Sequence, residues 1–110
     1  HAGTKYMRFL MDRYFSDESI DDFNRWLLAL AAYNAGPSRV INLRNEAQRN
    51  GYDPDVWFDN VEIIAARRIG SETVTYVSNI FKYYAGYQMA FARLNEADRR
   101  FGDAVRSCAD

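Results

Sequence analysis

The sequence predicts an all-α fold. Apolar residues recur in steps of three and four along most of the 110 residues, and no segment shows the alternation typical of a strand. Glycine and proline stand where helices would end or begin, which divides the chain into five helical segments. Hydrophobic residues make up 48% of the chain and aromatic residues 15%, which indicates the core of one domain or part of one.

The first helix is predicted over Ala2 to Phe15, where the apolar positions are Tyr6, Met7, Leu10, Met11 and Tyr14. Ser19 followed by Asp22 fits a capping box, so the second helix is expected from Ile20 to about Ala35. Its apolar stripe contains Ile20, Phe23, Leu27, Leu30 and Ala31. Asn34 continues this stripe, and an amide on a buried face costs stability unless it has hydrogen-bond partners.

Gly36 and Pro37 separate the second helix from the third. Glycine can take the left-handed conformation that ends a helix, and proline is suited to the first turn of the next one. The third helix is expected over about Ser38 to Asn50 and to end at Gly51. Its apolar side consists of Val40, Ile41, Leu43 and Ala47.

A short turn is predicted around Asp53 and Pro54, with the aspartate as N-cap. The fourth helix is expected over about Asn60 to Ile69. Gly70 would end it, and Ser71 would cap the last helix.

The last helix is long and has a seam with a period of 3.5 residues. The seam positions are Val77, Ile80, Tyr84, Tyr87, Phe91, Leu94 and Phe101. Because tyrosine fills several of them, we interpret the seam as a helix crossing the domain core in preference to a dimeric zipper.

Composition excludes several classes of function. The net charge of −1 argues against nucleic acid as a bulk partner, and no apolar run is long enough to span a membrane. No signal peptide is recognisable. His1, the only histidine, is expected to be a solvated end residue and Cys108 an inert thiol, so we expect no metal site and no cofactor. Carboxylate, amide and aromatic groups are left, which are the groups that proteins use on sugars.

Three segments carry a family resemblance: "AGTKYMRFLMDRYF", "ALAAYNAGPSRV" and "SETVTYVSNIFKYY". In this order and spacing they resemble the soluble lytic transglycosylase (SLT) family, and "VWFDNVEIIAARRIG" strengthens the match. The resemblance covers about Ala2 to Tyr87. It implies a lysozyme-like domain (the goose-type-lysozyme/SLT fold) over residues 1–87, with residues 88–110 as a helical extension.

The family resemblance also implies an activity. Such proteins cleave the glycosidic bond between N-acetylmuramic acid and N-acetylglucosamine in peptidoglycan and close a 1,6-anhydro ring. One glutamic acid, in a Glu-Ser motif followed by a Gly-Leu-Met-Gln-type motif, acts first as acid and then as base. None of the five glutamates has that context: Glu18, Glu46, Glu62, Glu72 and Glu96. We therefore expect the C-terminal part of the domain, truncated at its N-terminal side, without the catalytic residue and inactive in isolation.

Four residues are carried over from the resemblance. Asn34, and less firmly Tyr33 beside it, resemble residues that line the glycan cleft. Tyr76 resembles a tyrosine whose hydroxyl reaches the catalytic glutamate, and Glu72 would help to bind sugar or order the site. The alternatives are that the two tyrosines are ordinary core residues and that Glu72 only complements the helix dipole.

Other side chains are given structural interpretations. Trp26 and Trp57 are expected in the core in preference to stacking on sugars. The arginines of "INLRNEAQRN" and "NVEIIAARRIG" are expected on solvated faces, although Arg67 or Arg68 could meet the acidic peptides of peptidoglycan.

The resemblance implies that the partner is the peptidoglycan glycan strand, in the bacterial cell envelope at the periplasm or the outer membrane. The alternative is a non-catalytic helical module that binds glycan or associates with itself, since exposed apolar helix faces favour a homo-oligomer. A generic helical bundle is the third interpretation.

Overall fold

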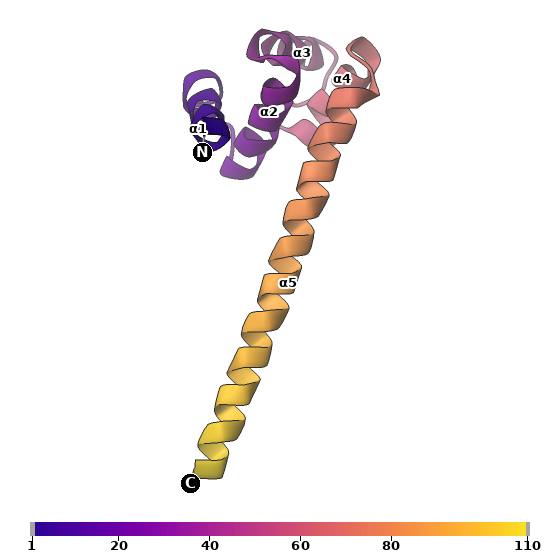
Figure 1. Ribbon diagram of the computed structural model, residues 1–110. Coiled ribbons are helices and arrows are strands. Elements are labelled where there is room, and N and C mark those ends of the chain that lie inside the picture. Colours follow the sequence, from indigo (N-terminus) through magenta and orange to yellow (C-terminus); the bar gives the residue numbers. More distant parts are fainter. Residues whose placement is uncertain (1, 110) are drawn as a thin grey trace. The chain divides into compact units, whose positions relative to one another are not determined.

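A computed structural model describes residues 2–109, and the side chains of residues 5–102. Over these residues the chain forms five α-helices, one irregular helical turn and no strand (Figure 1). The elements are α1 (Ala2–Tyr14), α2 (Asp22–Ala35), α3 (Pro37–Arg49), η1 (Trp57–Val61), α4 (Glu62–Arg68) and α5 (Ser71–Ala109). The predicted all-α class is confirmed.

The chain divides into two compact units, the first ending at Ser78 and the second beginning at Asn79. In the first unit α2 packs against α1 and α3, and α3 packs against α4 and η1 (Figure 1). Every side chain from Leu27 to Ala32 is buried, so α2 is enclosed on all sides over this stretch. The helix with the most apolar sequence therefore forms the centre of the unit.

Three glycines end or separate helices as predicted. Gly36, Gly51 and Gly70 have φ values of 100°, 85° and 85°, a region that favours glycine. Pro37 is the first residue of α3, where its missing N–H costs no helical hydrogen bond.

The start of α2 differs from the prediction. Its N-cap is Asp21, whose carboxylate accepts a hydrogen bond of 2.8 Å from the backbone N of Asn24, so the capping box at Ser19 is wrong. Ile20 is buried but precedes the helix. Phe23, expected in the core, is 43% exposed, whereas Asn24 is only 8% exposed. The amide is buried because a distant backbone group needs it.

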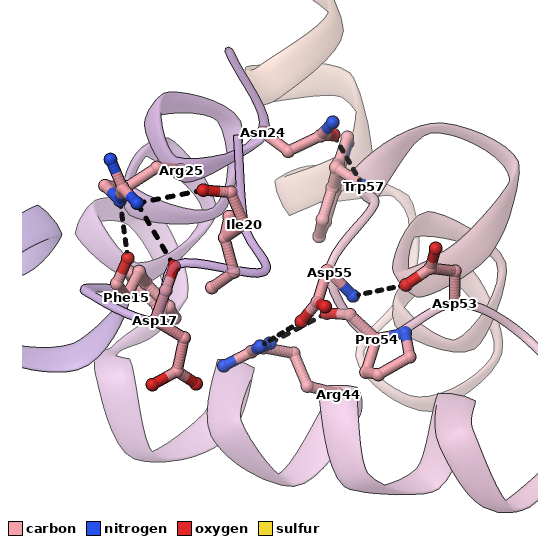
Figure 2. A network of polar contacts seen from close by, with 10 residues as sticks. All are labelled: Phe15, Asp17, Ile20, Asn24, Arg25, Arg44, Asp53, Pro54, Asp55 and Trp57. Carbon is pink, nitrogen blue, oxygen red and sulfur yellow. Dashed lines mark hydrogen bonds and ion pairs between the residues drawn. The ribbon is translucent and has the colours of Figure 1, made fainter. Parts of the chain in front are cut away.

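That group is the backbone N of Trp57, which donates to Asn24 Oδ1 at 3.0 Å (Figure 2). The Asn24 amide nitrogen donates to Asp21 at 3.0 Å. A single asparagine thus joins the start of α2 to η1, 33 residues away. The indole ring of Trp57 is fully buried, as predicted.

Two arginines hold the loops of the first unit. Arg25 donates to the carbonyl oxygens of Phe15, Asp17 and Ile20 and so fixes the loop between α1 and α2 (Figure 2). Arg44 donates to Pro54 O and Asp55 Oδ1, each at 2.8 Å. Its guanidinium carbon lies 5.8 Å from the centre of the Phe15 ring.

Arg44 therefore contradicts the expectation of a solvated arginine face, because its side chain is mostly buried. The pattern of α3 could not show this, since the partners of Arg44 lie in the following loop. Arg68 pairs with Glu46 at 2.7 Å and is largely exposed, which agrees with the expectation, as does exposed Arg67.

The segment before α4 is an irregular turn. Val61 N donates to Val56 O at 3.1 Å, a bond wider than that of an α-helix, and Asp59 has a φ of 60°. Regular α4 begins at Glu62, two residues later than predicted. Glu62 accepts a hydrogen bond from Asp59 N at 3.1 Å, which satisfies one donor at this helix start.

Helix α5 begins at Ser71 itself and contributes its first two turns to the first unit. Thr73 and Val77 are buried there. From Tyr84 onward the described seam residues are exposed, which contradicts the expectation that this helix crosses a core. The second unit consists of this one helix, so within the described part of that unit no other element packs on the seam.

Candidate functional site

The end of α2 and the start of α5 meet through one hydrogen bond. Thr73 Oγ1 donates to Asn34 Oδ1 at 2.7 Å, across a separation of 39 residues. Thr73 is buried and Asn34 is half-buried. The bond joins the segments "ALAAYNAGPSRV" and "SETVTYV", which the sequence singled out separately.

Asn34 is placed by the abrupt end of α2. Gly36 N donates to Ala32 O at 2.8 Å, and the positive φ of Gly36 turns the chain directly into α3. Thr73 uses the oxygen of the Asn34 amide. For the amide N–H groups the described part of the chain offers no hydrogen-bond partner, so two donors are available to a ligand.

Tyr76 lies one turn beyond Thr73 on α5. Partial burial raises the pKa of its hydroxyl above the ordinary value of 10.0, and the nearby phenol of Tyr33 raises it further. At neutral pH Tyr76 is therefore a neutral phenol that can donate a hydrogen bond. The structure thus brings together three of the residues selected from the sequence: Tyr33, Asn34 and Tyr76.

An aromatic surface adjoins these polar groups. The ring of Tyr33 contacts that of Tyr6 at a centroid distance of 5.8 Å, and Tyr6 stacks on Phe9 at 6.1 Å. All three rings are about half exposed. Half-exposed aromatic rings beside hydrogen-bonding groups suit an amphipathic ligand such as a sugar, which offers both apolar faces and hydroxyls.

Glu72 is exposed in the first turn of α5, four residues before Tyr76, and so projects from the same side of the helix. Glu18 is the one glutamate followed by serine, but it lies exposed in the loop before α2. The length of α2, about 20 Å, separates it from Asn34. The other three glutamates have partners within the chain. Glu46 forms an ion pair with Arg68 and Glu96 one with Arg100, while Glu62 accepts a hydrogen bond from Asp59 N.

The described residues contain no group of three or more metal-ligating side chains. No helix among them is both long and apolar enough to cross a membrane. The predictions for His1 and for the thiol of Cys108 concern parts that the structure does not describe. Trp26 is half-buried and contacts Phe23 at 6.4 Å, away from Asn34 on the first turns of α2.

Sequence reasoning missed Thr73, Tyr6 and Phe9. Tyr6 belongs to the predicted apolar stripe of α1 and Phe9 lies three residues after it, and both side chains are about half exposed. Thr73 stands three residues before Tyr76 inside a recognised segment, and this spacing was the available signal.

The protein is thus an all-α domain with one candidate site. The polar groups of that site are an amide, a hydroxyl and phenols, and they lie beside exposed aromatic rings. Comparison with known proteins gives the family: the chain belongs to the transglycosylase SLT domain family, whose model matches residues 1–56. The matched part includes Tyr33 and Asn34 and ends before Thr73.

Named relatives extend the match. Membrane-bound lytic murein transglycosylase F of Pseudomonas fluorescens is 35% identical over 98 residues, covering 76% of this chain and 19% of the relative. The protein of the same name in Pseudomonas syringae is 34% identical over the same shares. Membrane-bound lytic murein transglycosylase F 1 of Alkalilimnicola ehrlichii is 33% identical over 112 residues, 90% of this chain and 22% of the relative. The chain thus spans about a fifth of the length of these relatives.

Proposed function

We propose that Tyr33, Asn34, Thr73 and Tyr76 form one wall of a glycan cleft in a peptidoglycan lytic transglycosylase. The Thr73–Asn34 hydrogen bond is the observation that carries the proposal, because it joins two separate family segments into one polar surface. Family membership supports the substrate class. The cell envelope is the corresponding location.

In the whole protein, this wall would serve cleavage of the bond between N-acetylmuramic acid and N-acetylglucosamine with closure of a 1,6-anhydro ring. The Asn34 amide would donate to a sugar oxygen, and Tyr33 with Tyr6 would support a sugar face. The neutral Tyr76 hydroxyl would donate to the carboxyl that acts as acid and base. That carboxyl would come from outside this sequence, because none of its glutamates has the family's motif.

Glu72 has two roles open to it, sugar binding or support of the helix start. Its exposure leaves it accessible to a ligand, and its place in the first turn of α5 equally suits support of the helix dipole. Residues 88–110 lie outside the wall in this proposal and form a helical extension.

Binding is tested with the 110-residue chain and a soluble peptidoglycan oligosaccharide, followed by NMR. We expect weak binding with shift changes at the Asn34 side-chain amide and at Tyr33. Asn34→Ala should weaken binding about tenfold by removing both donors. Asn45→Ala, at an exposed position of α3, is the matched control and should bind like the unchanged chain. Equal loss in both variants would refute the cleft assignment.

Activity is tested separately on peptidoglycan sacculi. The chain alone should release no 1,6-anhydro-muropeptides, since it lacks the acid in this scheme. Abundant product from the chain alone would show that one of its own carboxyls acts, and Glu72→Gln would then identify or exclude the nearest one.

The alternative function is a non-catalytic helical module that binds glycan or associates with itself. A longer form of the protein that binds the oligosaccharide at Asn34 yet cleaves no sacculi would favour this alternative.

A further inference from the structure

The second unit carries an exposed apolar seam with a strict heptad spacing. We use the term α5 seam for Tyr87, Phe91, Leu94, Asp98 and Phe101, which follow one another in steps of four, three, four and three. This is the spacing of a and d positions in a coiled coil. The four apolar members are between 51% and 72% exposed, so each retains most of its contact surface for a partner.

Charge is arranged around the α5 seam in a specific way. Between residues 79 and 102, the charged residues outside the seam occupy the b, c and f positions: Lys82, Arg93, Glu96, Arg99 and Arg100. The positions that flank the seam on one side include Ala90 and Ala97, and those on the other side include Gln88 and Asn95. Uncharged flanks allow a second helix to approach without meeting unpaired charge.

We propose that the α5 seam binds the α5 seam of a second copy of this chain in antiparallel orientation. In an antiparallel pair a positions face d positions, so Phe91 would lie against Leu94 of the other copy. The same register places Tyr87 opposite Asp98 of the other copy. The Tyr87 hydroxyl then donates to the Asp98 carboxylate, which provides a partner for the one charged group in the seam.

Asp98 argues for this orientation and against the parallel one. A parallel pair would bring the two Asp98 carboxylates together at one level, and like charges in a desolvated seam repel. Antiparallel registers displaced by one heptad would place Asp98 opposite Leu94 or Ile80, neither of which can donate a hydrogen bond. The register centred between Phe91 and Leu94 satisfies both Asp98 side chains.

The area is sufficient for association. From the exposed fractions and the usual size of these side chains, burying the four apolar members would remove about 500 Å² per copy and about 1,000 Å² in the pair. A biological interface is expected to bury at least about 1,000 Å² and a stable one about 1,200–2,000 Å², so the pair lies at the weak end of this range. The expected dimer is therefore concentration-dependent, and sedimentation should show both species at micromolar concentrations.

The test uses the full 110-residue chain and sedimentation equilibrium. Leu94→Asp should raise the dimer dissociation constant at least roughly 100-fold, because it buries an unpaired carboxylate at the centre of the seam. Met89→Asp is the matched control: Met89 is exposed on α5 but at an f position outside the seam, so dimerisation should be unchanged. Circular dichroism at the same concentrations would show whether each variant keeps its helix.

A second measurement tests the orientation and register. In a Cys108→Ser background, spin labels at Lys82→Cys should lie about 30 Å apart or more, since residue 82 is far from the centre of the pair. A parallel pair would bring residue 82 of both copies to the same level along the axis, so the labels would be separated only across the pair and would lie clearly closer together. Tyr87→Phe should weaken the dimer about tenfold, and much less when Asp98→Asn is also present.

A monomer at every concentration would overturn the proposal. A dimer that persists in Leu94→Asp would also overturn it, because association would then use another surface. A short distance between the spin labels would overturn the antiparallel orientation. The proposal is supported if Leu94→Asp loses both the dimer and helix content while Met89→Asp keeps the dimer and its helix content.

Discussion

Two asparagines on α2 should respond very differently to the same substitution. Asn24 and Asn34 stand ten residues apart, and each accepts a hydrogen bond through Oδ1. Asn24 accepts from the buried backbone N of Trp57 and also donates to Asp21. Asn34 is half-buried, and among the described residues only Thr73 donates to it. We predict that Asn24→Ala is strongly destabilising and that Asn34→Ala is not.

The magnitudes follow from what each change leaves unpaired. Asn24→Ala leaves the buried Trp57 N without an acceptor and removes the bond to Asp21, which together cost about 2–4 kcal/mol. Asn34→Ala removes the acceptor of the Thr73 hydroxyl, which can then rotate toward water or a backbone carbonyl. Alanine also favours a helix more than asparagine does, so the net cost should be below about 1 kcal/mol. Asn45→Ala, exposed on α3, calibrates the helix preference alone.

The assay is urea and thermal unfolding, followed by circular dichroism and tryptophan fluorescence. For a unit of this size the expected change in Tm is a fall of roughly 10–25 °C for Asn24→Ala and a few degrees for Asn34→Ala. Equal losses for both variants would refute the distinction between a structural and a ligand-facing amide. A loss below about 1 kcal/mol for Asn24→Ala would refute the role assigned to the Trp57 contact.

Three further substitutions test separate features. Arg44→Ala should lower the free energy of unfolding, measured in urea, by about 2–4 kcal/mol because it leaves Asp55 and Pro54 O unpaired. Arg39→Ala, on the exposed side of α3, should lower it by less than about 0.5 kcal/mol. Gly36→Ala should cost about 1–3 kcal/mol by the same measurement, because a φ of 100° is strained for alanine even where its Cβ meets nothing. Because folding raises the pKa of Tyr76, its contribution is fully present below pH 10 and is lost as the pH rises through the raised pKa. Tyr76→Phe should therefore reduce the fall in the urea midpoint between pH 8 and pH 11.

The sequence was sufficient for features that depend on neighbouring residues. Gly36, Gly51 and Gly70 mark helix ends because left-handed backbone favours glycine regardless of distant contacts. Pro37 opens α3 for an equally local reason. The predicted bounds of α3 and α4 are consequently within two residues of those observed.

The failures concern residues whose partners lie far along the chain. Asn24 replaces Phe23 as a buried residue because Trp57 N needs an acceptor, and Arg44 is buried because Pro54 and Asp55 offer one. Helical periodicity carries no information on such pairings. The same limit applies to the candidate site: the family segments indicated Tyr33, Asn34 and Tyr76 individually, but Thr73 is recognisable only once α2 and α5 are placed together.

Helix α5 serves two purposes that impose different demands on one continuous element. Its first two turns must hold Thr73 against Asn34, and burial of Val77 anchors them in the first unit. Beyond Ser78 no packing within its own unit supports the helix, and isolated helices are marginal in water. Residues 79–109 therefore need stabilisation from another surface, and in our proposal the α5 seam of a second copy supplies it.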